Sequence, residues 1–140
     1  MEFIFELRRK TGKKISLESG NEIINANDKL HWHVKHKLTA HLRMLGCEAT
    51  QSEEYSIDKP LFHEANTCEV VIKISSPTNR RLDGPNLYPT VKALIDGMTD
   101  SGLWSDDNNN VIKRLSFETL DKNNKNIYEL HIEIKNTEVV

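Results

Sequence analysis

The spacing of apolar residues along the chain predicts two amphipathic helices. Between Leu30 and Gly46 an apolar residue returns every three or four positions, so a helix there would bury one face. Asn27 or Asp28 would cap its first turn. A second stripe has the same spacing and consists of Leu87, Val91, Leu94, Ile95 and Met98.

Local signals predict both ends of the second helix. The side chain of Asn86 can accept hydrogen bonds from the amides of a first helical turn, and Pro89 needs no N–H there. We therefore expect Asn86 to be the N-cap and Leu87 to be the first helical residue. Gly102 can adopt a left-handed conformation that stops the helix, after which Leu103 and Trp104 return to the core.

Runs of alternating or β-branched residues predict the strands, which are 2–7, 67–75, 111–119 and 127–135. Residues 13–17 could form a hairpin with the first strand, and residues 121–124 are a turn signal between the last two. Residues 51–66 show no clean period and indicate a long loop. The predicted fold is α+β, with a small mixed β-sheet, two helices packed on one face and the order β(β)αβαββ.

Length and composition predict one soluble domain. A chain of 140 residues can build a single core, and we expect one domain over residues 1–140. No apolar run approaches the ~20 residues of a membrane span, so no membrane partner is expected. The first ten residues lack the layout of a secretory signal. Two cysteines are too few for a disulfide framework, which indicates reduced thiols and a cytoplasmic location.

The distribution of charge matters more than the formal net charge of −2. Residues 1–43 hold nine Lys or Arg against five acidic residues, whereas residues 44–70 hold one lysine against six acidic residues. A local positive surface can attract a polyanion even when the whole molecule is slightly negative. The alternative is that these charges are an ordinary solvated surface.

Acidic residues are predicted at both ends of the second helix. Asp83 precedes it, and Asp106 and Asp107 follow it. If the strand that starts at Val111 lies beside the strand that ends at Ser75, Asp107 comes near Asp83. The two carboxylates could then share a hard cation such as Mg²⁺.

The segment from Arg80 to Ile112 resembles the RusA family of Holliday-junction resolvases, which are structure-specific endonucleases usually encoded by phages and prophages. In that family an Arg-Arg-Asp-x-Asp-Asn stretch opens a helix that contains a lysine and an Asp-x-Leu, and Gly-Phe/Val-Trp/Leu-x-Asp-Asp and a strand follow. The counterparts in this chain are Arg80, Arg81, Asp83, Asn86, Lys92, Asp96, Gly102, Trp104, Asp106, Asp107, Val111 and Ile112.

The chain departs from the family pattern at three places. Pro85 stands where the family has a second acidic residue, and Leu82 separates the arginines from Asp83. Residues 88–90 are inserted before Lys92, as in a branch of the family with an Asp-x-x-Asn-x-x-Pro-Thr-x-Lys pattern. Residues 25–43 are also similar to that branch. The resemblance implies DNA contacts from Asn25, Asn27, Lys29, His31, Trp32 and Lys35.

The resemblance implies a metal-dependent endodeoxyribonuclease that cuts branched DNA and works as a homodimer, because resolving a junction takes two symmetric nicks. Asp83 and Asp107 would be catalytic ligands of Mg²⁺, or of Mn²⁺, with Asp106 as a third ligand. Lys92 could stabilise the pentacoordinate phosphorane, and Asn86 could position a water molecule or a ligand. The arginine pair, Arg80 and Arg81, suits bidentate contacts with phosphates.

Each of these motifs also has a purely structural interpretation. Residues 83–86 are an ordinary turn and cap, Lys92 and Asp96 are an ordinary i,i+4 pair, and residues 106–110 suit any loop. With Pro85 in place of an acid, the chain could be a non-catalytic DNA-binding module of the same fold. It could also be an interaction domain whose acidic loop contacts a protein. The histidines at 31, 33, 36 and 41 lack the i,i+4 pair of a zinc site.

Overall fold

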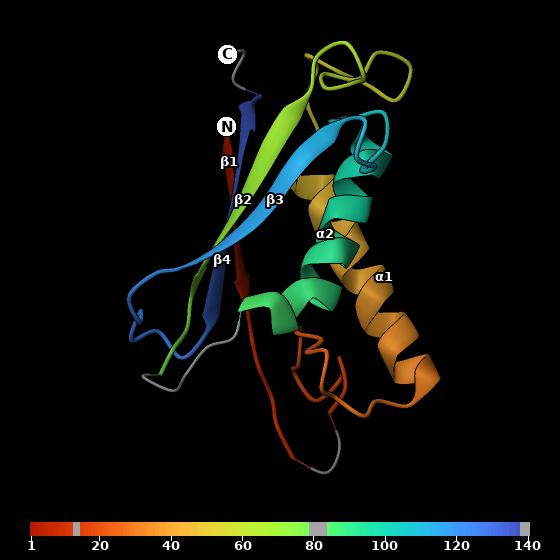
Figure 1. The fold of residues 1–140 in the computed structure, drawn as a ribbon. Helices are drawn as coiled ribbons and strands as arrows, with labels where there is room; N and C mark the ends of the chain where they lie inside the picture. The colour runs from red at the N-terminus through yellow and green to blue at the C-terminus, as the bar shows by residue number, and fades with distance from the viewer. Residues whose placement is uncertain (13–14, 79–83, 138–140) are drawn as a thin grey trace.

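The computed structural model describes residues 1–12, 15–78 and 84–137 and shows an α+β fold (Figure 1). Its strands are β1 (Glu2–Leu7), β2 (Cys68–Ser75), β3 (Ile112–Thr119) and β4 (Tyr128–Asn136). Its helices are α1 (Trp32–Ala49) and α2 (Tyr88–Ser101), and a short 3-10 helix η1 (Gly84–Leu87) precedes α2. The order βαβαββ confirms the predicted fold class.

The four strands form one mixed sheet in the order β1-β4-β2-β3. The β2 and β3 strands are parallel and are joined by the crossover through α2, whereas β4 runs antiparallel to both β1 and β2. The last two strands are therefore not a hairpin, although residues 121–124 do lie between them. Instead the connection crosses the end of β2, where the Asn123 side chain donates hydrogen bonds to the carbonyls of Ser75 and Ile127.

Both helices lie on the same side of the sheet (Figure 1). Alternate residues of the two central strands are buried in a core cluster shared with the helices, including Val70, Ile72, Ile74, Leu130, Ile132 and Ile134. All five residues of the predicted second stripe are buried as well. Each fully buried aliphatic side chain stabilises the fold by ~1.5–3 kcal/mol relative to an exposed one, so this shared core holds α2 on the sheet. Within the described residues, neither helix combines the length and apolarity of a membrane crossing.

The two helices cross at a pair of glycines. A Cβ atom at Gly97 would lie 2.7 Å from the backbone nitrogen of Cys47, and one at Gly46 would lie 2.9 Å from the carbonyl carbon of Leu94. Real Cβ atoms do not approach other heavy atoms so closely, so the two backbones can meet only because both positions lack a side chain. Beside this crossing, Arg43 of α1 holds Asp100 of α2 through two hydrogen bonds of 2.6 and 2.8 Å.

The first helix differs from its prediction at both ends. It begins at Trp32 with His31 as N-cap, whereas we expected Leu30 with Asn27 or Asp28 as the cap. The Asp28 carboxylate instead accepts hydrogen bonds from both terminal nitrogens of Arg9, at 2.8 Å each. The helix also continues through Gly46 to Ala49, because that glycine serves the contact with α2 and does not stop the helix.

The second helix begins one residue later than predicted. Its N-cap position is Leu87, which makes no side-chain capping bond, so the prediction that Asn86 caps this helix was wrong. Asn86 lies within η1, and its carbonyl accepts a hydrogen bond of 2.7 Å from the Ala26 amide. The predicted roles of Pro89 in the first turn and of Gly102 as a left-handed stop, with φ of 87°, are confirmed.

Two further expectations concern irregular segments. Residues 13–14 lie outside the described residues, and residues 15–17 form no strand, so the neighbour of β1 is β4 and not a hairpin partner. Residues 51–66 form the predicted loop and contain only isolated bridges. That loop packs on the fold through the buried side chains of Tyr55 and Phe62.

Candidate functional site

A groove of about 170 Å³ runs between α2 and the beginning of β3. The polar side chains among its lining residues come from both elements and from the loop before β3. The full lining consists of Tyr88, Lys92, Ile95, Asp107, Asn109, Ile112, Lys113, Arg114 and Leu115. The groove therefore contains two of the predicted catalytic residues, Lys92 and Asp107.

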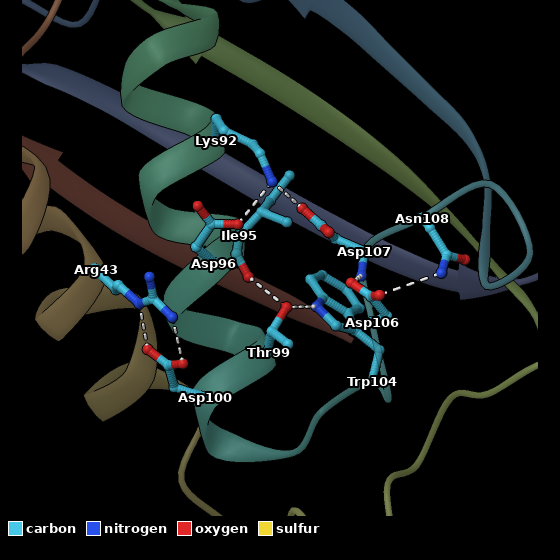
Figure 2. A network of polar contacts seen from close by, with 10 residues as sticks. All are labelled: Arg43, Lys92, Ile95, Asp96, Thr99, Asp100, Trp104, Asp106, Asp107 and Asn108. Atoms are coloured by element: carbon cyan, nitrogen blue, oxygen red, sulfur yellow. Dashed lines mark hydrogen bonds and ion pairs between the residues drawn. The ribbon is translucent and has the colours of Figure 1, made fainter.

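The ammonium group of Lys92 lies between two carboxylates (Figure 2). It donates a hydrogen bond of 2.7 Å to Oδ1 of Asp96, one turn further along α2, and a second one to Oδ2 of Asp107. All three side chains are partly buried, and that of Asp107 is the least exposed of the three. One carboxylate from α2, that of Asp96, and one from the loop before β3, that of Asp107, thus bind the same ammonium group.

These contacts shift the pKa values of both partners of the Lys92 and Asp107 pair. Burial alone would lower the pKa of Lys92, but the hydrogen bonds and charges of Asp107 and Asp96 outweigh it and raise that pKa above its usual value. Burial would likewise raise the pKa of Asp107, but the hydrogen bond and charge of Lys92 outweigh it and lower that pKa. Both groups are therefore ionised at neutral pH.

Hydrogen bonds of the loop after α2 position Asp107. The buried indole of Trp104 donates a hydrogen bond of 2.8 Å to Oγ1 of Thr99, which ties this loop to α2 (Figure 2). Oδ1 of Asp106 accepts a hydrogen bond of 2.7 Å from the Asp107 amide, and Oδ2 accepts one from Asn108. The carboxylate of Asp106 is therefore engaged within its own loop, while that of Asp107 faces Lys92.

The condition that the strand from Val111 lies beside the strand that ends at Ser75 is met, because β3 pairs with β2, and the two strands are parallel. The first residue of β3, Ile112, lies beside the first residue of β2, Cys68, so strand pairing does not by itself bring Asp107 to the segment after β2. Gly84, which follows Asp83 in the chain, lies near Phe117 in the second half of β3. Asp83 lies outside the described residues, and its meeting with Asp107 stays a prediction.

Three residues of the site were not predicted. Asp96 was named as a counterpart in the family motif and as a helical partner of Lys92, but no role at the site was predicted for it. Lys113 and Arg114 were not considered. Cys68 pairs with Ile112 and Glu69 pairs with Arg114, so Lys113 is an extra residue of a β-bulge at the groove. Bulges redirect side chains and are common beside active sites. Neither basic residue has a carboxylate partner in the described part of the chain.

The donor set of the groove suits a hard divalent cation. Mg²⁺ binds carboxylate oxygens and keeps most of its water ligands, so one or two carboxylates can suffice. Asp107, which already holds a cationic group, provides one such ligand, and Asp106 is its neighbour in the chain. Within residues 1–12, 15–78 and 84–137, however, no three His, Cys, Asp or Glu side chains form a group that could hold a metal ion. Asp83, the other predicted ligand, lies outside these residues.

Three of the residues predicted to contact DNA, Asn25, Lys29 and Lys35, lie beside the start of α2. The Ala26 amide bonds to the Asn86 carbonyl, and Oγ1 of Thr90 is hydrogen-bonded at 2.8 Å to both the amide and the carbonyl of Ile24. A second groove of about 250 Å³ adjoins this junction, and its lining includes Asn25, Lys29, Lys35 and Pro89.

The remaining predicted contacts are exposed or lie outside the description. Asn27, His31 and Trp32 are exposed on the same loop and at the start of α1. The structure thus brings Asn86 together with residues 24–26, while Lys92 and Asp107 meet in the groove between α2 and β3. Arg80 and Arg81 lie outside the described residues, so their phosphate contacts stay predictions.

Comparison of the sequence with protein-family models finds no match, and comparison with curated proteins finds none either. The resemblance to the RusA family therefore rests on the motif residues alone. The geometry of the groove provides a separate line of argument for function.

Proposed function

We propose that this protein is a metal-dependent, structure-specific endodeoxyribonuclease of the RusA type that cuts branched DNA such as Holliday junctions. The observation that carries the proposal is the position of Lys92 between Asp96 and Asp107 in an open groove. A phosphodiester in this groove would meet a carboxylate that can hold a cation and an ammonium that can contact the same phosphate. Both groups are needed when negative charge increases during hydrolysis.

The carboxylate of Asp107 would hold Mg²⁺ or Mn²⁺ together with Asp83 and Asp106. When bound there, the ion neutralises a phosphate oxygen and lowers the pKa of a coordinated water molecule. Asp107 would have to release Lys92 to do so. Asp96 would keep the ammonium in the groove, because it lies one turn away on the same helix. A lysine ammonium is protonated at neutral pH even at its ordinary pKa, so Lys92 can donate to a phosphate oxygen in the transition state.

The remaining predicted residues would bind and orient the DNA. Arg80 and Arg81 would hold phosphates beside the site, and Asn86 would link the cleavage groove to the loop that carries Asn25 and Lys29. We infer a homodimer, which would present two such grooves to the two strands of a junction. Both cysteines are free thiols, which is consistent with the cytoplasmic location that we propose.

One observation favours a second function. Pro85 stands in place of the second acidic residue of the family motif. The alternative is therefore a non-catalytic DNA-binding module of the same fold. It would bind branched DNA through the same basic residues but would not cut it.

The test is nicking of a synthetic four-way junction by purified protein with MgCl₂ or MnCl₂, and with EDTA as the negative control. We expect nicking only with metal, and loss of nicking with near-normal junction binding in Asp83→Asn and in Asp107→Asn. Asp58→Asn is the matched control, because Asp58 is exposed on the 51–66 loop and has no ion-pair partner in the described residues.

Three outcomes separate the functions. Cleavage by Asp107→Asn within about tenfold of wild type, a loss of only ~1.4 kcal/mol in barrier, would exclude this residue as an essential ligand. Junction binding without cleavage under any metal condition would favour the non-catalytic module. Failure to bind DNA at all would favour the protein-interaction domain.

A further inference from the structure

The two tryptophans of the chain have opposite environments. The side chain of Trp104 is 1% exposed in the core, whereas Trp32 is 75% exposed at the first position of α1. Its ring has two aromatic neighbours, with centroid distances of 6.0 Å to His31 and 5.8 Å to His33, and the two histidine rings are 4.0 Å apart. We call these three residues the ring cluster. A tryptophan buries a large apolar area when it binds a partner, and the exposed indole of Trp32 has most of that area available.

The charges around the ring cluster are positive. Lys29 and Lys35 are exposed, and neither has a carboxylate partner within the described residues. The nearest acid in sequence, Asp28, is held by both terminal nitrogens of Arg9, and the first turn of α1 contains no acidic residue. The surface therefore combines aromatic faces with unpaired cations, which is the pattern of proteins that bind single-stranded nucleic acid.

Two adjoining grooves run from His31 of the ring cluster to α2. One of about 470 Å³ is lined by residues that include His31, Lys29 and Leu30. The other, of about 250 Å³, shares Lys29 and Leu30 and extends to Pro89 in the first turn of α2. Lys92 follows Pro89 by less than one helical turn. A DNA strand that lies in these grooves could thus extend from the ring cluster toward the proposed cleavage groove.

We propose that Trp32, supported by His31 and His33, is a stacking platform for an unpaired base of the DNA substrate. This inference rests on the proposed function, because it takes DNA as the ligand. Bases within a duplex are already stacked on their neighbours, so the platform can engage only a base at a branch point, a gap or a single-stranded arm. It would therefore give the protein a preference for DNA with unpaired nucleotides near the junction.

A second copy of the chain is a less favourable occupant of this surface. In a two-fold dimer that buried the ring cluster, the same patch would meet itself, so Lys29 and Lys35 of one copy would face those of the other. Like charges brought together in this way oppose association. A phosphate backbone has the opposite charge and is attracted to both lysines.

The experiment uses the intrinsic fluorescence of the full-length chain and an unlabelled dT15 oligonucleotide, in EDTA so that no cleavage occurs. Because Trp104 is buried, Trp32 is the tryptophan whose emission a stacked base can quench. We expect dT15 to quench the wild type and to leave the remaining emission of Trp32→Phe almost unchanged. Affinity for dT15, measured by competition with a labelled oligonucleotide, should fall roughly 5- to 150-fold in Trp32→Ala, which corresponds to ~1–3 kcal/mol per stacked base.

The controls separate stacking from general effects. Trp32→Phe should retain most of the affinity because it keeps an aromatic face, and Ile57→Ala, which removes another exposed apolar side chain, should bind like wild type. Trp32→Ala with wild-type affinity for dT15 would overturn the proposal. So would Trp32 emission that changes with protein concentration alone, which would show that a second copy covers the ring cluster.

The result is also distinct from the test of nuclease activity. If the protein binds dT15 through Trp32 but cuts no junction with Mg²⁺, the stacking proposal stands and the nuclease proposal fails. If the wild type cuts junctions but Trp32→Ala binds dT15 with normal affinity, the nuclease proposal stands and the stacking proposal fails. A wild type that binds neither dT15 nor junction DNA would overturn both proposals.

Discussion

Substituting alanine for Gly97 should force α1 and α2 apart and destabilise the protein. The new Cβ atom would lie 2.7 Å from the backbone nitrogen of Cys47 and closer still to the carbonyl oxygen of Arg43. Weak contacts of carbon with backbone polar atoms are found at about 3.3 Å and beyond, so the Cys47 contact alone requires a shift of roughly 0.6 Å, and the closer contact with Arg43 requires more. Because both obstructing atoms belong to the backbone of α1, no side-chain rotation can relieve the clash.

The expected loss of stability is the difference between two effects. Overpacking a close contact costs ~1–3 kcal/mol, occasionally more, and a backbone obstruction places Gly97→Ala at or above the upper end. Alanine also favours the helical state over glycine by ~1 kcal/mol. The net loss should be ~2 kcal/mol or more. For a chain of this size it corresponds to a fall in melting temperature of roughly 6–10 °C.

Urea and thermal unfolding of wild type and variants provide the measurement. Gly46→Ala should have a similar effect, because its Cβ would meet the carbonyl group of Leu94 across the same crossing. The double variant should lose less than the sum, because one separation of the helices accommodates both methyl groups. Ala40→Gly is the control for helix propensity alone, since Ala40 is exposed in α1, and it should lose ~1 kcal/mol. A Gly97→Ala variant at least as stable as wild type would refute the close crossing.

Three further predictions concern the candidate site and the assembly. At pH 7 wild type should be more stable than Asp107→Asn, and this difference should shrink as the pH falls below about 4. The folded-state pKa of Asp107 is lowered, and the stability that a carboxyl group with a lowered pKa contributes is lost as the pH falls through that pKa. Urea titrations at pH 7 and pH 3 measure the difference. At ten times its dissociation constant Mg²⁺ should stabilise wild type by ~1.4 kcal/mol, a rise of roughly 4–6 °C in melting temperature, and the Asp83→Asn/Asp107→Asn double variant should not respond. Light scattering at micromolar concentration should give the mass of a dimer of the 16.1 kDa chain.

Each of these predictions has a result that would contradict it. A stability difference between wild type and Asp107→Asn that is unchanged at pH 3 would mean that the pair with Lys92 does not stabilise the fold. NaCl of equal ionic strength controls for screening in the Mg²⁺ experiment, and an equal response of wild type and double variant would exclude the acidic residues as the metal site. A monomeric mass together with full junction cleavage would refute the homodimer.

Features that depend on neighbouring residues in the chain could be predicted from the sequence. The bounds of β1, the buried stripe of α2 and the left-handed Gly102 were all predicted correctly. Periodicity decides which face of an element is buried, and glycine is the residue that best tolerates positive φ, so both signals are local. The residue types of the candidate site were also evident from the sequence, which has a lysine within one helix and aspartates before and after that helix.

Where a side chain could form more than one local interaction, the tertiary structure decided which interaction it forms. Asp28 and Asn86 were both suitable caps, but Arg9 engages the Asp28 carboxylate, and Asn86 lies inside η1, so the cap position falls on Leu87. Gly46 appeared to end a helix, and only the proximity of α2 shows that it serves a crossing.

The tertiary structure also decided which strands are neighbours in the sheet and which residues meet at the candidate site. The β4 strand lies between β1 and β2 because strand order follows the burial of whole faces, which no short segment encodes. The same holds for the groove. The sequence places Lys92 and Asp107 fifteen residues apart, and their contact exists because the crossover lays α2 along β3 while Trp104 ties the intervening loop back to Thr99. Long-range contacts of this kind arise from the packing of complete elements, so the chemistry of the groove was determined by the fold as a whole.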